Sequence, residues 1–176
     1  MSQFACDLRD YIREIHDFPK PGVLFRDITP LLSHPEAFRT TIAGFAERYR
    51  HDSIDVLVAA EARGFIFAAP LALELGVGFV PIRKPGKLPF DTHSFHYELE
   101  YGRDTLEMHI DGVISGQRVL VVDDLLATGG TVQACCQLLE RAGAAVVECA
   151  FVIELLGLGG AKALAPHRIF SLLQYD

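Results

Sequence analysis

Two adjacent carboxylates stand between an apolar run and a loop of small residues. Asp123 and Asp124 follow the run Arg118–Val122, and a loop rich in glycine and threonine leads from them into a predicted helix. Glycines let a backbone approach a ligand closely, and the amides at a helix N-terminus bind phosphate. The predicted phosphate ligands are the residues of this loop: Ala127, Thr128, Gly129, Gly130 and Thr131.

The acid pair is unsuited to the phosphate itself, because like charges repel. Two carboxylates suit a vicinal diol, since each accepts a hydrogen bond from a hydroxyl group. An acid pair beside a phosphate loop therefore indicates a sugar phosphate as the ligand. The loop is not a nucleotide P-loop, because the chain contains no G-x-x-x-x-G-K-[ST] sequence. An acidic turn that happens to contain glycines is the alternative interpretation.

A second anion site is predicted where the sequence Glu61-Ala62-Arg63-Gly64 follows a strand and opens a helix. The planar guanidinium group of Arg63 suits pyrophosphate oxygens. Farther along, the segment Arg83–Lys87 supplies three positive charges within five residues. Taken alone, Arg63 is also compatible with a solvated arginine at a helix start, and the basic segment with a solvated loop.

An α/β sheet is needed to bring these motifs together. Apolar β-branched runs separated by helices predict a parallel sheet with helices on both faces. Ligands bind at the carboxyl ends of such strands, so both anion sites are expected at the same sheet edge. The predicted strands are Ile54–Ala59, Val77–Arg83, Arg118–Val122, Val146–Glu154 and Arg168–Leu173, and the predicted helices are Gly64–Leu75 and about Thr131–Ala142.

Three further segments lie outside this alternation. Apolar residues recur at helical spacing near the N-terminus and predict an amphipathic helix; they are Phe4, Leu8, Ile12 and Ile15. A second helix is predicted after Ser33 and Glu36, which resemble a capping box. Residues 95–101 and 106–110 alternate in polarity on either side of Gly102, which predicts a hairpin that projects from the sheet.

Length, charge and cysteine spacing narrow the class of protein. The chain has 176 residues and a formal net charge of −7. This length suits one domain, residues 1–176, and an acidic chain is a poor candidate for sequence-independent nucleic-acid binding. The charged N-terminus is unlike a signal peptide, and the longest nearly apolar stretch, Gly64–Leu73, is too short to span a membrane. The cysteines form no C-x-x-C pair, so we expect reduced thiols in a cytoplasmic protein and no structural zinc.

The segment Asp123–Thr131, which reads DDLLATGGT, resembles the motif of type I phosphoribosyltransferases that binds phosphoribosyl pyrophosphate (PRPP). Its particular form resembles the adenine-specific branch of that family. Other segments that match this branch are Phe18–Ile28, Glu61–Phe65, Arg83–Pro89, Leu99–Gly102 and Phe170–Tyr175. The resemblance implies the type I phosphoribosyltransferase fold: a central, mostly parallel sheet flanked by helices, with a small N-terminal hood (residues 1 to about 35) and a flexible catalytic hairpin (about 89 to 105).

The resemblance also implies roles for individual residues. It assigns catalytic roles to Glu100, Tyr101, Arg63 and Lys87, and pyrophosphate binding to Arg63, Arg83 and Lys87. It assigns the ribose to the acid pair, the 5-phosphate to the loop after it, and adenine to Leu24, Phe25 and Arg26. Without the resemblance, Glu100 would be interpreted as a solvent-facing hairpin residue, and Phe25 as a core residue.

The implied reaction transfers 5-phosphoribosyl from PRPP to N9 of adenine and yields AMP and pyrophosphate. Mg²⁺ is the implied cofactor, held mainly by substrate and water, with no metal ligand from the protein. The implied partners are these four small molecules and a second copy of the chain, with neither nucleic acid nor membrane. Two alternatives stay open: a sister transferase for another base, and a noncatalytic PRPP-sensing regulator on the same fold.

Overall fold

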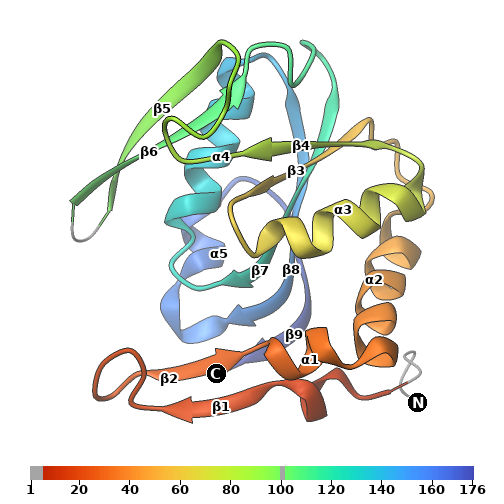
Figure 1. The fold of residues 1–176 in the computed structure, drawn as a ribbon, viewed down its shortest axis with the longest axis vertical. Coiled ribbons are helices and arrows are strands. Elements are labelled where there is room, and N and C mark those ends of the chain that lie inside the picture. Colours follow the sequence, from red (N-terminus) through yellow and green to blue (C-terminus); the bar gives the residue numbers. More distant parts are fainter. Residues whose placement is uncertain (1–5, 100–101) are drawn as a thin grey trace. The chain divides into compact units, whose positions relative to one another are not determined.

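The computed structural model describes residues 6–99 and 102–176. The chain divides into two compact units, residues 1–48 and 49–176, and each is described by itself. The second unit contains the central sheet (Figure 1). Among the described residues, no helix has the length and apolar character needed to cross a bilayer.

Five parallel strands form the sheet of the second unit. Their order is β4-β3-β7-β8-β9, and every neighbouring pair is parallel. The strands are β3 (Val56–Ala60), β4 (Gly78–Ile82), β7 (Arg118–Leu126), β8 (Ala145–Leu155) and β9 (Ile169–Tyr175). The predicted parallel sheet is therefore confirmed. From β3 the chain proceeds toward one edge and from β7 toward the other, so the strand order reverses between β3 and β7, where ligands bind in folds of this kind.

Two helices cover the two faces of this sheet (Figure 1). Helix α3 (Gly64–Leu75) connects β3 to β4, and α4 (Gly130–Arg141) connects β7 to β8. Such crossovers are right-handed, and because these two run in opposite directions they place their helices on opposite faces. Side chains alternate accordingly: Val56, Val58 and Ala60 share a buried cluster with the apolar side chains of α4. Helix α3 ends at Gly76 in a left-handed conformation (φ 69°), where the sequence predicts its end.

The predicted hairpin is confirmed. It consists of β5 (Thr92–Leu99) and β6 (Gly102–His109), paired antiparallel from Thr92↔His109 to Leu99↔Gly102. Three of its side chains, Phe95, Leu106 and Met108, are buried in the same cluster as α4. A backbone bridge between Arg83 and Glu107 joins β6 to the end of β4. The part of the hairpin that contains Phe95 and Glu107 is therefore anchored to the second unit.

The prediction of an N-terminal helix is wrong. The first unit begins with a single 3₁₀ turn, η1 (Leu8–Tyr11), followed by β1 (Arg13–His16) and β2 (Leu24–Asp27). The two strands pair antiparallel, with Ile15 opposite Phe25. Pairing with a partner outside the local segment outweighs the helical spacing of the apolar residues, which is only a weak local preference. Of that set, Phe4 lies outside the described residues.

The predicted second helix is present, but its cap differs from the prediction. The first unit continues with α1 (Thr29–Ser33), and α2 extends from Pro35 to Tyr49. The Ser33 hydroxyl donates to the Pro30 carbonyl oxygen (3.0 Å) and so closes α1. The ring nitrogen Nδ1 of His34 accepts a hydrogen bond from the Ala37 amide (3.3 Å). The capping-box prediction is therefore wrong, since the side chain that accepts from the first turn of α2 is that of His34, while Ser33 bonds back to Pro30.

The sequence analysis missed one region and misplaced one boundary that matter for the site. Strand β7 was predicted to end at Val122 but extends to Leu126, because its last residues still pair with β8 up to Glu154. The acid pair therefore lies on the strand and not in a loop after it. The missed region follows β8: a 3₁₀ turn, η2 (Leu156–Leu158), and the short helix α5 (Gly160–Ala163).

Candidate active site

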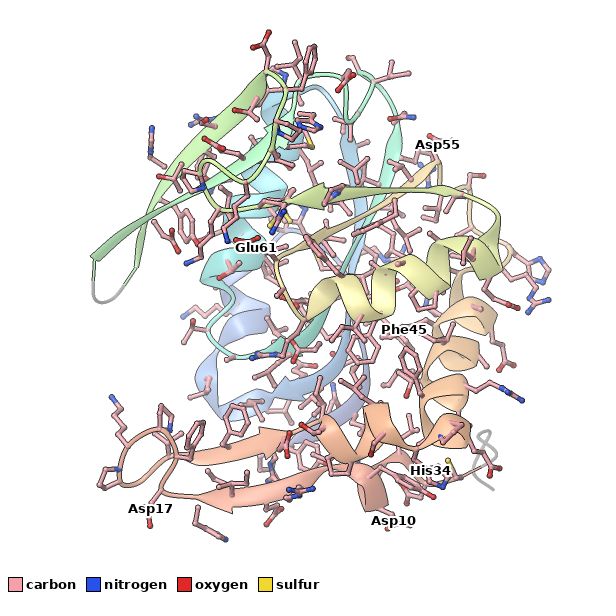
Figure 2. All side chains as sticks on the ribbon, viewed as in Figure 1. Asp10, Asp17, His34, Phe45, Asp55 and Glu61 are labelled. Atoms are coloured by element: carbon pink, nitrogen blue, oxygen red, sulfur yellow. The ribbon has the colours of Figure 1, made fainter. Side chains whose placement is uncertain are left out.

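A cavity of about 370 Å³ opens at the carboxyl ends of β3 and β7. Glu61, labelled in Figure 2, stands directly after β3 on one side of it. The lining residues are Glu61, Ala62, Arg63, Asp123, Asp124, Leu125, Leu126, Ala127, Thr128, Gly129, Gly130, Thr131 and Val132. The predicted ribose and phosphate residues all line this cavity, together with Arg63, so the structure joins the two predicted anion sites in one cavity.

The phosphate loop depends on a glycine at the start of α4. Gly129 has φ 85° and caps the helix, a conformation that L side chains rarely adopt. Space is restricted there as well, because a Cβ on Gly129 would lie 3.1 Å from the carbonyl oxygen of Gly160. The loop between β7 and α4 thus turns sharply and directs the first amides of α4 toward the cavity.

Helix α5 supports the loop from behind. The side-chain amide of Gln133 in α4 donates to the carbonyl oxygen of Ala163 (3.0 Å). A Cβ on Gly160 would collide with the Ala127 carbonyl oxygen and lie 2.6 Å from a methyl carbon of Leu126. The loop and α5 therefore touch at backbone distance, and a glycine is required for that approach.

The acid pair is directed into the cavity with an arginine against it. The side chain of Asp124 is only 6% exposed, and its carboxylate accepts a hydrogen bond from Nε of Arg63 (2.5 Å). Burial of the Arg63 guanidinium acts against its charge, but the Asp124 carboxylate outweighs burial and raises the pKa of Arg63. Burial and the neighbouring Asp124 charge raise the pKa of Asp123 to about 8. One of the two acids is thus paired, and the other holds a proton more tightly than usual.

The start of α3 lies directly against the acid pair. A Cβ on Gly64 would lie 2.9 Å from the carbonyl oxygen of Val122 and 3.1 Å from Oδ1 of Asp123. The peptide bond between Glu61 and Ala62 is cis. Because only a glycine fits at position 64, the segment that carries Arg63 and the strand that carries the acids are held at a fixed separation.

The basic segment after β4 is organised by carboxylates. Glu61 accepts hydrogen bonds from Nε of Arg83 (2.8 Å) and from the amide of Lys84 (3.2 Å). Desolvation opposes the charge of Glu61, but these hydrogen bonds prevail and lower the pKa of Glu61. The amine of Lys84 pairs with Asp104 of β6 (2.9 Å). Lys87 does not line the cavity; within residues 6–99 and 102–176, no salt bridge to its amine is present.

The sequence analysis overlooked three acidic residues that hold this segment. Glu61 orients Arg83, Asp104 holds Lys84, and Glu107 accepts a hydrogen bond from the amide of Gly86 (3.1 Å). Glu61 precedes Arg63 in the matched motif, and that position was the available signal. No local signal marks Asp104 or Glu107, because their contacts depend on how the hairpin docks beside β4.

The predicted adenine residues lie in the first unit, on β2. Leu24 is opposite His16, Phe25 is opposite Ile15, and Arg26 is opposite Glu14, with which its guanidinium forms an ion pair. The ring of Phe25 meets that of Phe18 edge to face, with centroids 5.1 Å apart. The predicted catalytic pair Glu100 and Tyr101 lies outside the described residues.

Comparison with known proteins agrees with this geometry. Residues 27–169 match the family described as phosphoribosyl transferase domain. The chain is 61% identical over 169 residues to an adenine phosphoribosyltransferase of Rhodopirellula baltica, which covers 96% of this chain and 82% of that protein. The match therefore extends over nearly the whole chain.

Solved structures give the same result at the level of the fold. The crystal structure of adenine phosphoribosyltransferase from Thermoanaerobacter pseudethanolicus has a TM-score of 0.92 and 52% identity, and the match covers 96% of this chain and 98% of that one. The Saccharomyces cerevisiae enzyme, complexed with D-2,5-dideoxy-2,5-imino-altritol 1,6-bisphosphate and adenine, has a TM-score of 0.89 and 40% identity, with 94% and 96% covered. The chain belongs to the adenine phosphoribosyltransferase branch of the phosphoribosyl transferase family.

Proposed function

We propose that this chain transfers 5-phosphoribosyl from PRPP to N9 of adenine and releases AMP and pyrophosphate, as a step of purine salvage. The observation that carries the proposal is the joining of a phosphate loop, an acid pair and Arg63 in one cavity at the reversal of strand order. A phosphate, a diol and a pyrophosphate are the three groups of PRPP. The Saccharomyces cerevisiae relative, which binds a bisphosphate and adenine together, supports the same pairing of ligands.

Each part of PRPP has a matching part of the site. The amides and hydroxyls of residues 127–131 bind the 5-phosphate. Asp123 and Asp124 accept hydrogen bonds from the ribose hydroxyls. Arg63, Arg83 and Lys87 bind the pyrophosphate; of these, Arg63 lines the cavity and Arg83 is held beside it by Glu61.

The reaction breaks the bond between C1′ and the pyrophosphate oxygen and forms the bond between C1′ and N9. The bonding electrons leave with pyrophosphate, so negative charge grows on the leaving group while positive charge grows on the ribose ring. Arg63 and Lys87 stabilise the leaving group. In this proposal Glu100 receives the proton that adenine loses, and Tyr101, the next residue of the chain, shares its catalytic role.

The donor set of the cavity fits Mg²⁺ held through substrate. Mg²⁺ prefers oxygen ligands and keeps several waters, and the cavity offers the Asp123 and Asp124 carboxylates, of which Asp124 is already paired with Arg63. Within residues 6–99 and 102–176, no group of three or more histidine, cysteine or acidic side chains is arranged to hold a metal. When bound to the pyrophosphate, Mg²⁺ supplies charge neutralisation of the leaving group.

Adenine is recognised by the segment Leu24–Arg26. This segment is β2 of a two-stranded sheet, and an edge strand presents backbone donors and acceptors outward. Adenine offers N1 as acceptor and N6–H₂ as donor, and hypoxanthine offers the reverse. Backbone groups that match adenine therefore meet hypoxanthine with two mismatches.

We further propose that the protein is a homodimer in the cytoplasm.

Product analysis with PRPP, Mg²⁺ and each purine base tests the proposal. We expect AMP from adenine, with kcat/KM for hypoxanthine and guanine lower by about 30-fold or more, since each unpaired buried polar group costs about 1–3 kcal/mol. Activity within tenfold on hypoxanthine or guanine would point to a sister transferase. Binding of PRPP without turnover of any base would point to a sensor.

A further inference from the structure

An acidic side chain lines the cavity in which the proposed substrate carries its negative charges. Glu61 stands directly after β3, its side chain is only 13% exposed, and it belongs to the cavity lining together with Arg63. Burial alone would raise the pKa of Glu61, but its hydrogen bonds lower it, so the group is ionised at neutral pH. A charged carboxylate repels phosphate groups, so its presence at this place needs a physical reason.

Both oxygens of this carboxylate bind the basic segment after β4. Oε2 accepts from Nε of Arg83 (2.8 Å), and Oε1 accepts from the backbone amide of Lys84 (3.2 Å). The backbone of Glu61 is joined to the same part of the chain, because its amide donates to the Ile82 carbonyl oxygen (2.9 Å). Glu61 therefore holds the chain at the point where β4 ends and the basic segment begins.

The hydrogen bond to Glu61 uses one edge of the Arg83 guanidinium group and leaves another open. Of its five N–H donors, the one on Nε is bound by Glu61 and one on Nη1 by the Lys87 carbonyl oxygen (3.4 Å). Across residues 6–99 and 102–176, Nη2 has no hydrogen-bond partner. The backbone of Arg83 is fixed as well, since it exchanges two hydrogen bonds with Glu107 of β6 (2.9 and 2.7 Å). Arg83 is thus held at its backbone and at Nε, and its Nη2 edge is left for an anion.

We propose that Glu61 is a positioning residue for the pyrophosphate group of the donor: its carboxylate holds Arg83 by Nε, so that the Nη2 edge binds a pyrophosphate oxygen. This inference rests on the proposed function, because it takes the basic segment as the pyrophosphate site. Glu61 itself repels the ligand, so its favourable effect on binding passes through Arg83. A lysine could not replace Arg83 here, since only a guanidinium group binds a carboxylate with one edge and a phosphate with another.

Ligands with and without pyrophosphate distinguish this role from a general structural one. PRPP carries the group and ribose 5-phosphate does not, and calorimetric titration with either needs no base and no turnover. The variant Glu61→Gln keeps the size of the side chain and removes its charge. We expect the Kd of PRPP to rise about tenfold, as for the loss of a hydrogen bond to a charged group, and the Kd of ribose 5-phosphate to stay within about twofold.

The sign of the change in PRPP binding is decisive. Removing a negative charge beside the ligand would by itself strengthen PRPP binding, whereas a loss of positioning weakens it. An unchanged or lower Kd for PRPP would overturn the proposal, and so would equal rises for both ligands. A loss confined to titrations that contain Mg²⁺ would also overturn it, because Glu61 would then act on the metal and not on Arg83.

The variant Arg83→Lys tests whether the effect passes through Arg83. It keeps the positive charge and removes the guanidinium edges, and we expect it to weaken PRPP binding about tenfold. In that background Glu61→Gln should add no more than about twofold, because the two changes remove the same interaction. A second tenfold loss would overturn the proposal. The matched control is Glu74→Gln on α3, at a carboxylate that pairs with Arg50 at 3.7 Å and does not line the cavity; we expect it to leave both Kd values unchanged.

These titrations separate the inference from the proposed reaction. A tenfold loss for PRPP alone would support the role of Glu61 even if the favoured base proves not to be adenine. Unchanged PRPP binding would overturn that role even if the wild-type protein makes AMP. In the reverse reaction, we expect Glu61→Gln to raise the KM for pyrophosphate about tenfold and to leave the KM for AMP within about twofold.

Discussion

The carboxylate of Asp124 has a cationic partner, Arg63, at 2.5 Å. A ribose hydroxyl must share this carboxylate with the guanidinium group. The variant Asp124→Asn keeps the shape of the side chain and removes its charge. We expect the KM for PRPP to rise by about 10- to 100-fold, since a hydrogen bond to a charged group contributes about 1.5–3 kcal/mol.

The KM for adenine is the internal control for that variant, and Asp111→Asn is the matched control, because Asp111 is exposed on the turn after β6. Both should stay within about twofold of the wild-type values. An unchanged KM for PRPP together with an unchanged kcat would remove Asp124 from the ribose site.

Asp123 gives the protein a pH dependence of stability. Its pKa is raised from 3.8 in the unfolded chain to about 8 in the fold, by burial and by the Asp124 charge. Folding therefore takes up a proton between these values. The stability that this group contributes is complete below about pH 4 and is lost as the pH rises through about 8.

The variant Asp123→Asn cannot take up that proton. Relative to the wild type, we expect its free energy of unfolding to increase with pH between 5 and 7, by at most about 1.4 kcal/mol per pH unit. Urea unfolding of both proteins at several pH values measures the difference, and other titrating groups cancel in it. Parallel curves would mean that Asp123 ionises normally in the fold.

The site residues that could be predicted from the sequence are those that lie next to one another in the chain. The loop from Ala127 to Thr131 and the acid pair are contiguous in sequence, so their pattern alone predicted a joint site, and the structure places them in one cavity. Asp104 carried no such signal. Its contact with Lys84 arises from the docking of the hairpin beside the end of β4, which no short window of sequence contains.

At the scale of elements, α5 determines the shape of the phosphate loop. The variant Gly160→Ala puts a methyl group against Ala127 and Leu126. We expect it to lower the free energy of unfolding by about 1–3 kcal/mol, as overpacking does, and to raise the KM for PRPP. The matched control is Gly157→Ala, where a Cβ meets nothing within 4 Å. Equal behaviour of the two variants would show that α5 does not support the loop.

The elements predicted correctly are those with long periodic patterns. Helix α3, for example, has its predicted bounds, Gly64–Leu75, because an apolar run closed by a glycine is unambiguous. The prediction for the N-terminal segment failed because helical spacing is only a weak local preference, and the pairing of Ile15 with Phe25 of β2 outweighs it. Helix α5 was missed because four residues, Gly160–Ala163, are too few for a helical pattern.

At the scale of the whole molecule, the exposed face of α3 is the candidate contact between two copies. Ile66 and Leu73 lie on the same side of the helix, and Leu73 is 85% exposed. Exposed apolar stripes of this kind mark interaction surfaces. If the proposed homodimer uses this face, we expect Leu73→Lys to give a monomer at micromolar concentration, as measured by light scattering after size exclusion.

The control for that variant is Ile114→Lys, which introduces the same charge at a residue that is 69% exposed and not on α3. We expect it to have the same oligomeric state as the wild type. A dimeric Leu73→Lys protein would place the contact elsewhere, and a monomeric wild type would remove the homodimer from the proposal.

Gly64 fixes the distance across the cavity between the Arg63 segment and the strand that carries the acid pair. A single missing Cβ separates the Arg63 segment from the carbonyl of Val122. The two sides of the cavity follow β3 and stand on β7, and these strands pair with each other from Val56↔Val119 to Val58↔Val121. We expect a cavity of fixed width to discriminate between phosphoribosyl donors by their length. We expect an analogue whose diphosphate is joined to the ribose through an added methylene to bind poorly, and one in which a methylene replaces the oxygen between the two phosphorus atoms to bind. Competition of each analogue with PRPP measures the difference, and equal binding would show that Gly64 does not set the length of the donor.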